Sequence, residues 1–297
     1  MKYNKQPLDI PALLVMLKAR GLIINDEEQA RRTLSIVSYF RLANYLRPME
    51  ADKETHQYKP GSSFENAVAL YQFDATLREI VFRAISNIEI ALRSKMIHHF
   101  SLKYGPFWFT DMSICNDEHL FLENLNAIDR EVRRSKEDYI KEHFSKYKDS
   151  AFPPAWKAME LLSLGTLAKL FFNASDNKVK KKIAREFGLP NHLAFESWMN
   201  SIAALRNCCA HHARIWNRNY PVTPDLPKRL HSAWIKDTAT PFNKLYAQLC
   251  CIAYWLNNIN PQNTFAADIK ALLQKYPTVN PAAMGMVTNW QDEPLWK

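Results

Sequence analysis

The strongest constraint on the fold of this chain is the helical spacing of its apolar residues after residue 62. Apolar side chains there recur three or four positions apart, which places them on one face of an α-helix. They are Leu70, Phe73, Leu77, Ile80, Val81, Ala84, Ile88, Ala91 and Leu92. Ser62 and Glu65 have the spacing of a capping box at its start, and Gly105-Pro106 ends the pattern. The sequence therefore predicts one long helix, or a broken pair of helices, over this stretch.

The rest of the chain has the same helical period. Asp9 is placed to cap a first helix, and Asp26 a second helix that runs toward Pro48. Further helices are predicted over residues 118–134, 154–173, 178–187, 192–216, 242–258 and 265–276. Alternating strand patterns are scarce, and only six glycines are present, which argues against a glycine-rich nucleotide-binding fold. We therefore expect an all-α protein.

A polar segment divides the chain unevenly. Residues 47–63 are polar and contain the turn sequence Pro60-Gly61, and residues 148–154 form a second candidate hinge. We expect an amino-terminal helical appendage over residues 1–60 and a helical body over residues 61–297. The two could also form one continuous domain.

The charge of the chain favours a polyanionic partner. The net charge is +9, so nucleic acid is the first expectation and an acidic membrane surface the second. Basic residues cluster at 130–136 and again at 178–185. We expect Lys180, Lys181 and Lys182 in the second cluster to contact phosphates, although such a run also suits a solvated helix face.

The cysteines and the apolar runs indicate a cytoplasmic protein. Cys115 and the adjacent pairs Cys208-Cys209 and Cys250-Cys251 do not form a disulfide framework, and they lack structural-zinc spacing. We therefore expect neither a metal nor another cofactor. The first residues lack an apolar signal core, and no apolar run approaches the ~20 residues of a membrane span, so no membrane partner is expected.

The segment from Arg206 to His211 carries the residue types that phosphodiester cleavage needs. A guanidinium binds two phosphate oxygens, and an imidazole exchanges a proton near neutral pH. In RNA, the histidine would manage the proton of the 2′-hydroxyl or of the leaving oxygen, and the arginine would stabilise charge on the phosphate. Asn207 shares a helix face with His211 and is expected to orient His211 or the phosphate. Arg206 and His211 are about 500° apart around the helix, so Arg206 would reach in from the flank or from a partner subunit.

Spacing alone does not decide the role of this segment, because the chain contains a second copy of it. Arg93 precedes His98 by five positions, and a second histidine follows there too. A polar helix face that is hydrogen-bonded to its neighbours is the alternative for either copy. Glu89 and Arg93 are spaced as a surface ion pair, or they line the same cleft as His211 and help position it.

Residues 204–218 resemble the signature of the AbiD/AbiF group of abortive-infection proteins, a branch of the HEPN superfamily. In that signature an arginine and a polar residue, often asparagine, precede a short spacer and a histidine. The resemblance extends over most of the chain in ordered blocks. These blocks are residues 21–24 with 39–45, 87–93 with 103–106, and 154–167 with 196–198.

The resemblance implies a HEPN-type helical bundle with additional helices, acting in phage defence as a homodimer in which two motifs face one composite site. Arg206 and His211 become the catalytic pair and Asn207 their polar partner. The leading hypothesis is a metal-independent endoribonuclease toxin that cuts RNA, with no DNA partner. The alternatives are a catalytically silent RNA-binding module regulated by a small noncoding RNA, and a helical interaction module without a nucleic-acid role.

Other residues are candidates for contacts with RNA beside the scissile bond. Near the amino terminus these are Arg41, Asn44, Tyr45 and Arg47, which could contact phosphate and stack a base, or dock their helix on the body. Arg214 and Arg218 follow the motif and could hold flanking RNA or form plain surface. His212 falls on another helix face than His211, where a bond to the backbone or to a neighbouring subunit is the plausible role.

Overall fold

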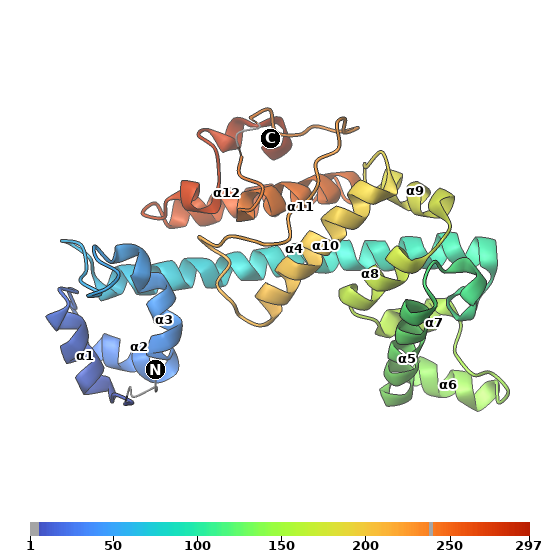
Figure 1. Cartoon of the computed structure of the whole chain (residues 1–297), viewed down its shortest axis with the longest axis horizontal. Coiled ribbons are helices and arrows are strands. Elements are labelled where there is room, and N and C mark those ends of the chain that lie inside the picture. Colours follow the sequence, from blue (N-terminus) through green and yellow to red (C-terminus); the bar gives the residue numbers. More distant parts are fainter. Residues whose placement is uncertain (1–5, 238–239) are drawn as a thin grey trace. The chain divides into compact units, whose positions relative to one another are not determined.

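The computed structural model describes residues 6–237 and 240–297, and over these residues every regular element is a helix (Figure 1). The predicted all-α class is confirmed. The described chain divides into two compact units, Met1–Arg78 with Leu272–Val279, and Glu79–Ala271 with Asn280–Lys297. None of its helices combines the length and apolar character that crossing a bilayer requires.

The boundary between the units differs from the predicted division after residue 60. It falls at Arg78, inside α4 (Phe64–Tyr104). The first turns of α4 belong to the amino-terminal unit because their side chains pack there. The Tyr45 hydroxyl donates to Asp74, 2.6 Å away, and the rings of Tyr45 and Tyr71 meet edge to face.

Three short helices precede α4 in the first unit: α1 (Ile10–Ala19), α2 (Glu27–Ile36) and α3 (Tyr39–Leu46). Asp9 and Asp26 cap α1 and α2 as predicted, since each carboxylate accepts a backbone N–H of the first turn. The predicted single helix from Asp26 toward Pro48 is wrong. It breaks after Ile36, and the Ser38 hydroxyl caps α3 by accepting the N–H of Arg41.

The long apolar pattern folds as the single helix α4, and not as a broken pair. Its predicted cap is off by one residue. The Ser63 hydroxyl, not that of Ser62, accepts the N–H of Asn66. The Glu65 carboxylate has hydrogen bonds at the start of its own helix, with the Ser63 side chain and with its own backbone, and these help to lower its pKa. It accepts the backbone N–H groups of Asn25 and Asp26, at 2.9 and 3.3 Å, where α2 begins.

The second unit contains the rest of α4 and the helices that follow it. These are α5 (Glu118–Arg134), α6 (Asp138–Lys146), α7 (Ala155–Ala158), α8 (Leu164–Asn173), α9 (Asn177–Glu186), α10 (His192–Ala210), α11 (Leu245–Ile259) and α12 (Phe265–Lys275), whose last turn joins the first unit. The predicted helix over 154–173 is split, because a 3₁₀ turn follows α7 and Ser163 then caps α8. The polar helix α6 was not predicted.

Helix α10 lies at the centre of this unit, in contact with α8, α9 and α11. α11 is buried along most of its length. Trp198 of α10 is fully buried, and its ring lies 5.4 to 5.8 Å from those of Trp234, Tyr254 and Trp255. α10 therefore gives any residue on its free face a rigid support.

Candidate functional site

The core-facing residues of α10 determine which side chains of the motif are free. Phe195, Trp198, Ile202, Leu205 and Cys209 are buried, at spacings of three and four along the helix. Arg206, Asn207 and His211 lie off this buried stripe: Arg206 is half-buried, and the other two are exposed.

The motif ends α10, whereas the sequence predicted that the helix continues to residue 216. The N–H of His212 donates to the carbonyl of Cys209, and the N–H of Ala213 donates to that of Cys208, at 3.0 and 2.9 Å. His212 has φ = 54°, in the left-handed region. Together these bonds form a Schellman motif, in which the left-handed residue is usually glycine. The turn closes the helix one residue after His211.

His211 is therefore the C-cap residue of α10 and not an interior helical residue. Its backbone N–H donates to the carbonyl of Asn207, at 3.0 Å. Its side chain is exposed and forms no hydrogen bond or ion pair with any residue that the structure describes. The imidazole is available to a ligand.

The guanidinium of Arg206 lies over an aromatic ring. Its central carbon is 5.5 Å from the centroid of Phe82, a half-exposed residue of α4, where α10 crosses that helix (Figure 1). No carboxylate in the described ranges pairs with Arg206, and its buried Nε lacks a hydrogen-bond partner there. A ring face stabilises a cation without neutralising it. Arg206 therefore keeps its positive charge beside an open surface.

Sequence reasoning missed Phe82 because it lies outside the apolar stripe of α4. An aromatic residue at an exposed helix position was the only available signal, and it names no partner. Cys208 and Cys209, the spacer of the motif, are unbridged thiols, and Cys209 is part of the buried face. Among residues 6–237 and 240–297, no group of three or more His, Cys, Asp or Glu side chains is arranged to hold a metal ion.

The second copy of the motif has different surroundings. Arg93 is buried, donates to the backbone carbonyl of Leu162 at 2.8 Å, and pairs with Glu89 and Glu160 at 3.1 and 3.5 Å. The predicted pair of Glu89 and Arg93 forms, but in a largely buried setting and not on the surface. The described contacts of these two residues do not include His211, so their role in positioning it stays a prediction.

The segment after α10 is held back against the same helix. The indole Nε1 of Trp198 donates to the Asp225 carbonyl at 2.7 Å, and the Ser201 hydroxyl donates to the Val222 carbonyl at 3.2 Å. The N–H of Asp225 donates to the Ser197 hydroxyl at 2.9 Å. Residues 213–222 therefore form a loop whose two ends are fixed on α10.

Arg214 and Arg218, which lie in this loop, are both half-buried. The guanidinium of Arg218 lies 5.6 Å from the ring centroid of Tyr220. Tyr220 itself is buried, and its hydroxyl donates to the Ile215 carbonyl at 3.1 Å. It therefore supports Arg218 and offers no ring face for a base. Contacts of Arg214 and Arg218 with RNA stay predictions.

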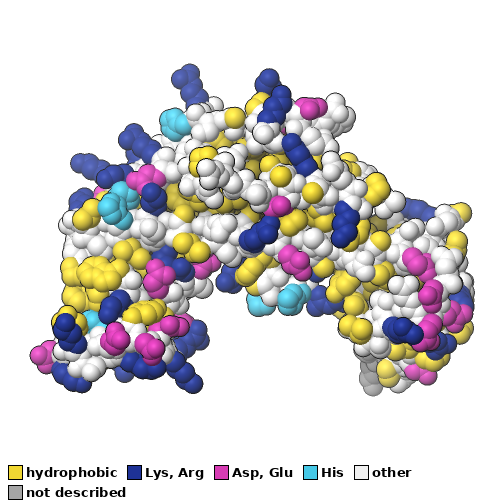
Figure 2. Space-filling view, turned by 180° about the vertical axis from the view of Figure 1, so that it is seen from behind, with side chains coloured by type: hydrophobic (Ala, Val, Ile, Leu, Met, Phe, Trp, Pro, Cys, Tyr) yellow, Lys and Arg dark blue, Asp and Glu magenta, His cyan; other side chains and the backbone are white. Residues whose placement is uncertain are grey.

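The predicted contact of Lys180 with phosphate needs correction. Its side chain is buried with the residue only 3% exposed, pairs with Glu196 at 2.5 Å and donates to the carbonyls of Phe172 and Ala174. These bonds fix it inside the fold, away from a nucleic-acid backbone. Lys181 and Lys182 are exposed. Figure 2 shows Lys and Arg side chains scattered among acidic and hydrophobic ones on the face in view, and not gathered in one basic patch.

The amino-terminal residues that were predicted to contact RNA also divide into buried and exposed ones. Tyr45 is buried, and burial together with Asp74 raises the pKa of its hydroxyl well above the ordinary value. It docks α3 on α4 and has no ring face left to stack a base, so that part of the prediction is wrong. Asn44 is half-buried, close to the carbonyls of Phe40 and Arg41. Arg41 and Arg47 are exposed.

Comparison with known proteins identifies the family. The model of the Abi-like protein family matches residues 32–217, well over half of the chain, and the match includes the whole segment from Arg206 to His211. The chain belongs to the Abi-like protein family. Membership supports a role in abortive infection, a form of phage defence. No curated protein and no solved structure matches the chain.

Proposed function

We propose that this Abi-like protein is an endoribonuclease toxin of the HEPN type, acting at the end of α10. The observation that carries the proposal is the position of the Arg206 guanidinium. Its guanidinium rests on the Phe82 ring without a carboxylate partner among the described residues, on the same helix end as the exposed Asn207 and His211. A fixed cation and a free imidazole supported by a buried helix are what phosphodiester cleavage requires.

The chemistry that fits these groups is attack by the neighbouring ribose hydroxyl. The 2′-oxygen bonds to phosphorus as its proton passes to a base, and the bond to the 5′-oxygen breaks as that oxygen gains a proton. The products are a 2′,3′-cyclic phosphate and a 5′-hydroxyl. His211 is the proton-transfer group, Arg206 stabilises the charge that builds on the phosphate, and Asn207 orients His211 or a phosphate oxygen. The residues supply this pathway without a metal ion.

One imidazole cannot both accept the first proton and donate the second at the same moment. In a homodimer with two copies of the motif facing one site, one His211 would serve as base and the other as acid. The dimer rests on the resemblance to HEPN proteins and belongs to the proposal.

The deciding experiment follows an unstructured RNA labelled at its 5′ end, incubated with the purified protein in the presence of EDTA. We expect 5′ fragments that end in a cyclic phosphate, and none when the 2′-hydroxyl at the cleavage position is replaced by hydrogen. Products ending in a 3′-hydroxyl would contradict the mechanism. Salt-sensitive RNA binding without any product would instead favour the silent RNA-binding module, and Arg206→Ala would then weaken affinity alone.

A further inference from the structure

A cavity of about 800 Å³ lies in the second unit, and residues of α6 and α7 line part of it. These two helices lie apart from the end of α10 (Figure 1). The walls of the cavity come from the segment after α4, the second half of α6, the segment that links α6 to α7, and α7. This volume is within the range of small-molecule sites, which combine apolar walls with a few polar groups. The cavity plays no part in the cleavage proposed above.

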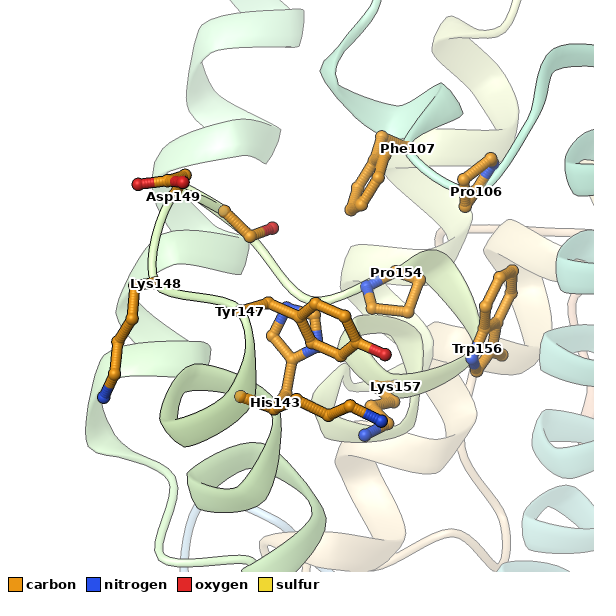
Figure 3. A pocket seen from close by; sticks show the side chains of 11 residues that line it. Pro106, Phe107, His143, Tyr147, Lys148, Asp149, Pro154, Trp156 and Lys157 are labelled. Carbon is orange, nitrogen blue, oxygen red and sulfur yellow. The ribbon is translucent and has the colours of Figure 1, made fainter.

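Three aromatic side chains open onto this cavity. Trp156 and Tyr147 are each 50% exposed, and Phe107 is also exposed. Figure 3 shows these three rings and Pro154 surrounding one space. Large aromatic side chains are usually buried, so three exposed ones around one hollow indicate a surface for a flat ligand. Successive aromatic faces are the stacking platforms that unpaired bases use.

Positive charge surrounds the same space. Lys146, Lys148 and Lys157 line the cavity, against the single acidic side chain of Asp149. The ion pairs among the described residues include none of these three lysines, and the Lys146 ammonium lies over the Tyr147 ring, 5.5 Å from its centroid. Lys157 donates to the backbone carbonyl of Tyr139 at 3.1 Å, and an ammonium group has two further donors. Uncompensated ammonium groups beside aromatic faces suit a ligand with a ring and a phosphate.

A buried histidine completes the wall. His143 lines the cavity but is only 5% exposed, and its ring lies 5.0 Å from that of Tyr147 (Figure 3). Its Nε2 has no hydrogen-bond partner among the described residues. Burial, with Lys157 nearby, lowers the pKa of His143. Buried polar atoms normally have a hydrogen-bond partner, so a ligand group that reaches Nε2 would supply the one that is missing among the described residues.

We infer that this cavity binds an unpaired nucleotide: the base stacks on Trp156, and the phosphate lies among Lys146, Lys148 and Lys157. A polar group of the nucleotide would supply the hydrogen-bond partner that His143 Nε2 lacks among the described residues. The nucleotide is either a free mononucleotide or one residue of a single-stranded RNA. Both sources present the same ring and phosphate, and the experiment below separates them.

The test uses the full chain and two probes, adenosine 5′-monophosphate by calorimetry and a fluorescein-labelled hexaadenylate RNA by anisotropy. Trp156→Ala is expected to weaken binding about tenfold or more, because one stacked base contributes that much. Trp156→Phe, which keeps a ring, should stay within about threefold of the unchanged protein. Lys146→Ala is expected to weaken binding several-fold, whereas Lys141→Ala is the matched control, an exposed lysine of α6 outside the cavity.

Losses in Trp156→Ala and Lys146→Ala with the mononucleotide support a free ligand, and losses with the hexamer alone support a strand. The inference is overturned if neither probe responds to these substitutions, or if inorganic phosphate displaces the mononucleotide at equal concentration, which would leave no role for the rings. His143→Gln keeps a polar side chain that can form a hydrogen bond, and its binding of both probes is expected to stay close to that of the unchanged protein. Thermal melting confirms that each variant is folded. Binding is measured without cleavage, so failure of the proposal for His211 leaves these readouts intact.

Discussion

The two segments in which an arginine precedes a histidine by five residues have the same spacing and different surroundings. On α4, Arg93 is buried and neutralised by Glu89 and Glu160. On α10, Arg206 rests on an aromatic ring and pairs with no described carboxylate. The first arginine is bonded to its own fold. The second arginine has a positive charge that no described carboxylate neutralises, so it can interact with a ligand.

The difference can be traced to the residue four positions before each arginine. That residue is Glu89 in the first segment and the buried Ile202 in the second. A glutamate at this spacing reaches the arginine on the same helix face, whereas isoleucine leaves it unpaired. The histidines differ as well. His98 lies within α4, which continues to Tyr104, whereas α10 ends at Ala210 and His211 is its C-cap residue. The role of this short motif therefore depends on the residues around it and on where its helix ends.

The largest expected effect is on stability, and it should appear at Arg93. Arg93→Ala removes the partner of a largely buried glutamate, which typically costs about 3 kcal/mol of unfolding free energy. Arg206→Ala should cost about 1 kcal/mol or less, because it removes a cation over a partly exposed ring. Urea unfolding of both variants measures the difference. Equal losses would mean that the two arginines are not distinguished by their partners.

The next effect separates the two histidines by activity. His211→Ala is expected to lower RNA cleavage by about 100-fold or more, the usual contribution of a positioned acid or base. His98→Ala is the matched control, an exposed histidine in the corresponding place, and should cleave like the unchanged protein. Initial rates on labelled RNA provide the measurement, with melting curves to confirm folding. A folded His211→Ala protein that still cuts at the normal rate would remove His211 from the mechanism.

A smaller effect tests the platform under Arg206. Phe82→Ala removes an interaction of ~0.5 to 1 kcal/mol, so cleavage should fall by about two- to fivefold. Phe82→Trp keeps a ring face and should preserve the rate. Single-turnover cleavage with both variants decides the point. If alanine and tryptophan give the same rate, the ring does not position the guanidinium.

The smallest effect concerns the turn that closes α10. His212 adopts a left-handed backbone, which suits glycine and strongly disfavours a β-branched residue. His212→Gly should leave stability within about 1 kcal/mol of the unchanged protein, whereas His212→Val should lose about 1 to 2 kcal/mol. Thermal unfolding of the pair provides the comparison. A stable valine variant would show that the turn rearranges easily.

Local patterns predicted most of the helices. The helix predicted over residues 118–134 has the same bounds as α5, and the helix predicted over residues 178–187 is shifted by one residue from α9. The break after Ile36 and the polar helix α6 were missed, because a serine cap interrupts one apolar period and α6 has few apolar residues. The end of α10 was missed because a histidine occupies a position where glycine is the usual signal.

The candidate site was predictable in its residue types but not in its surroundings. Arg206, Asn207 and His211 follow from the motif. The burial of Tyr45 and Lys180 was not predictable, because the sequence does not show that a polar side chain points inward to a partner far away in the chain. Phe82 is 124 positions before Arg206, and only the packing of α10 on α4 brings the two together.

The loop after α10 has a thermodynamic consequence. Its first residues continue from the closing turn of the helix, and its far end is bonded to Ser201 and Trp198 of that same helix. The conformational entropy of these residues is lost when the protein folds, so a ligand that docks against the loop meets a surface that is already ordered. Arg214 and Arg218 therefore lie on an ordered loop whose two ends are bonded to α10. Their distance from the end of α10 changes only if these hydrogen bonds break.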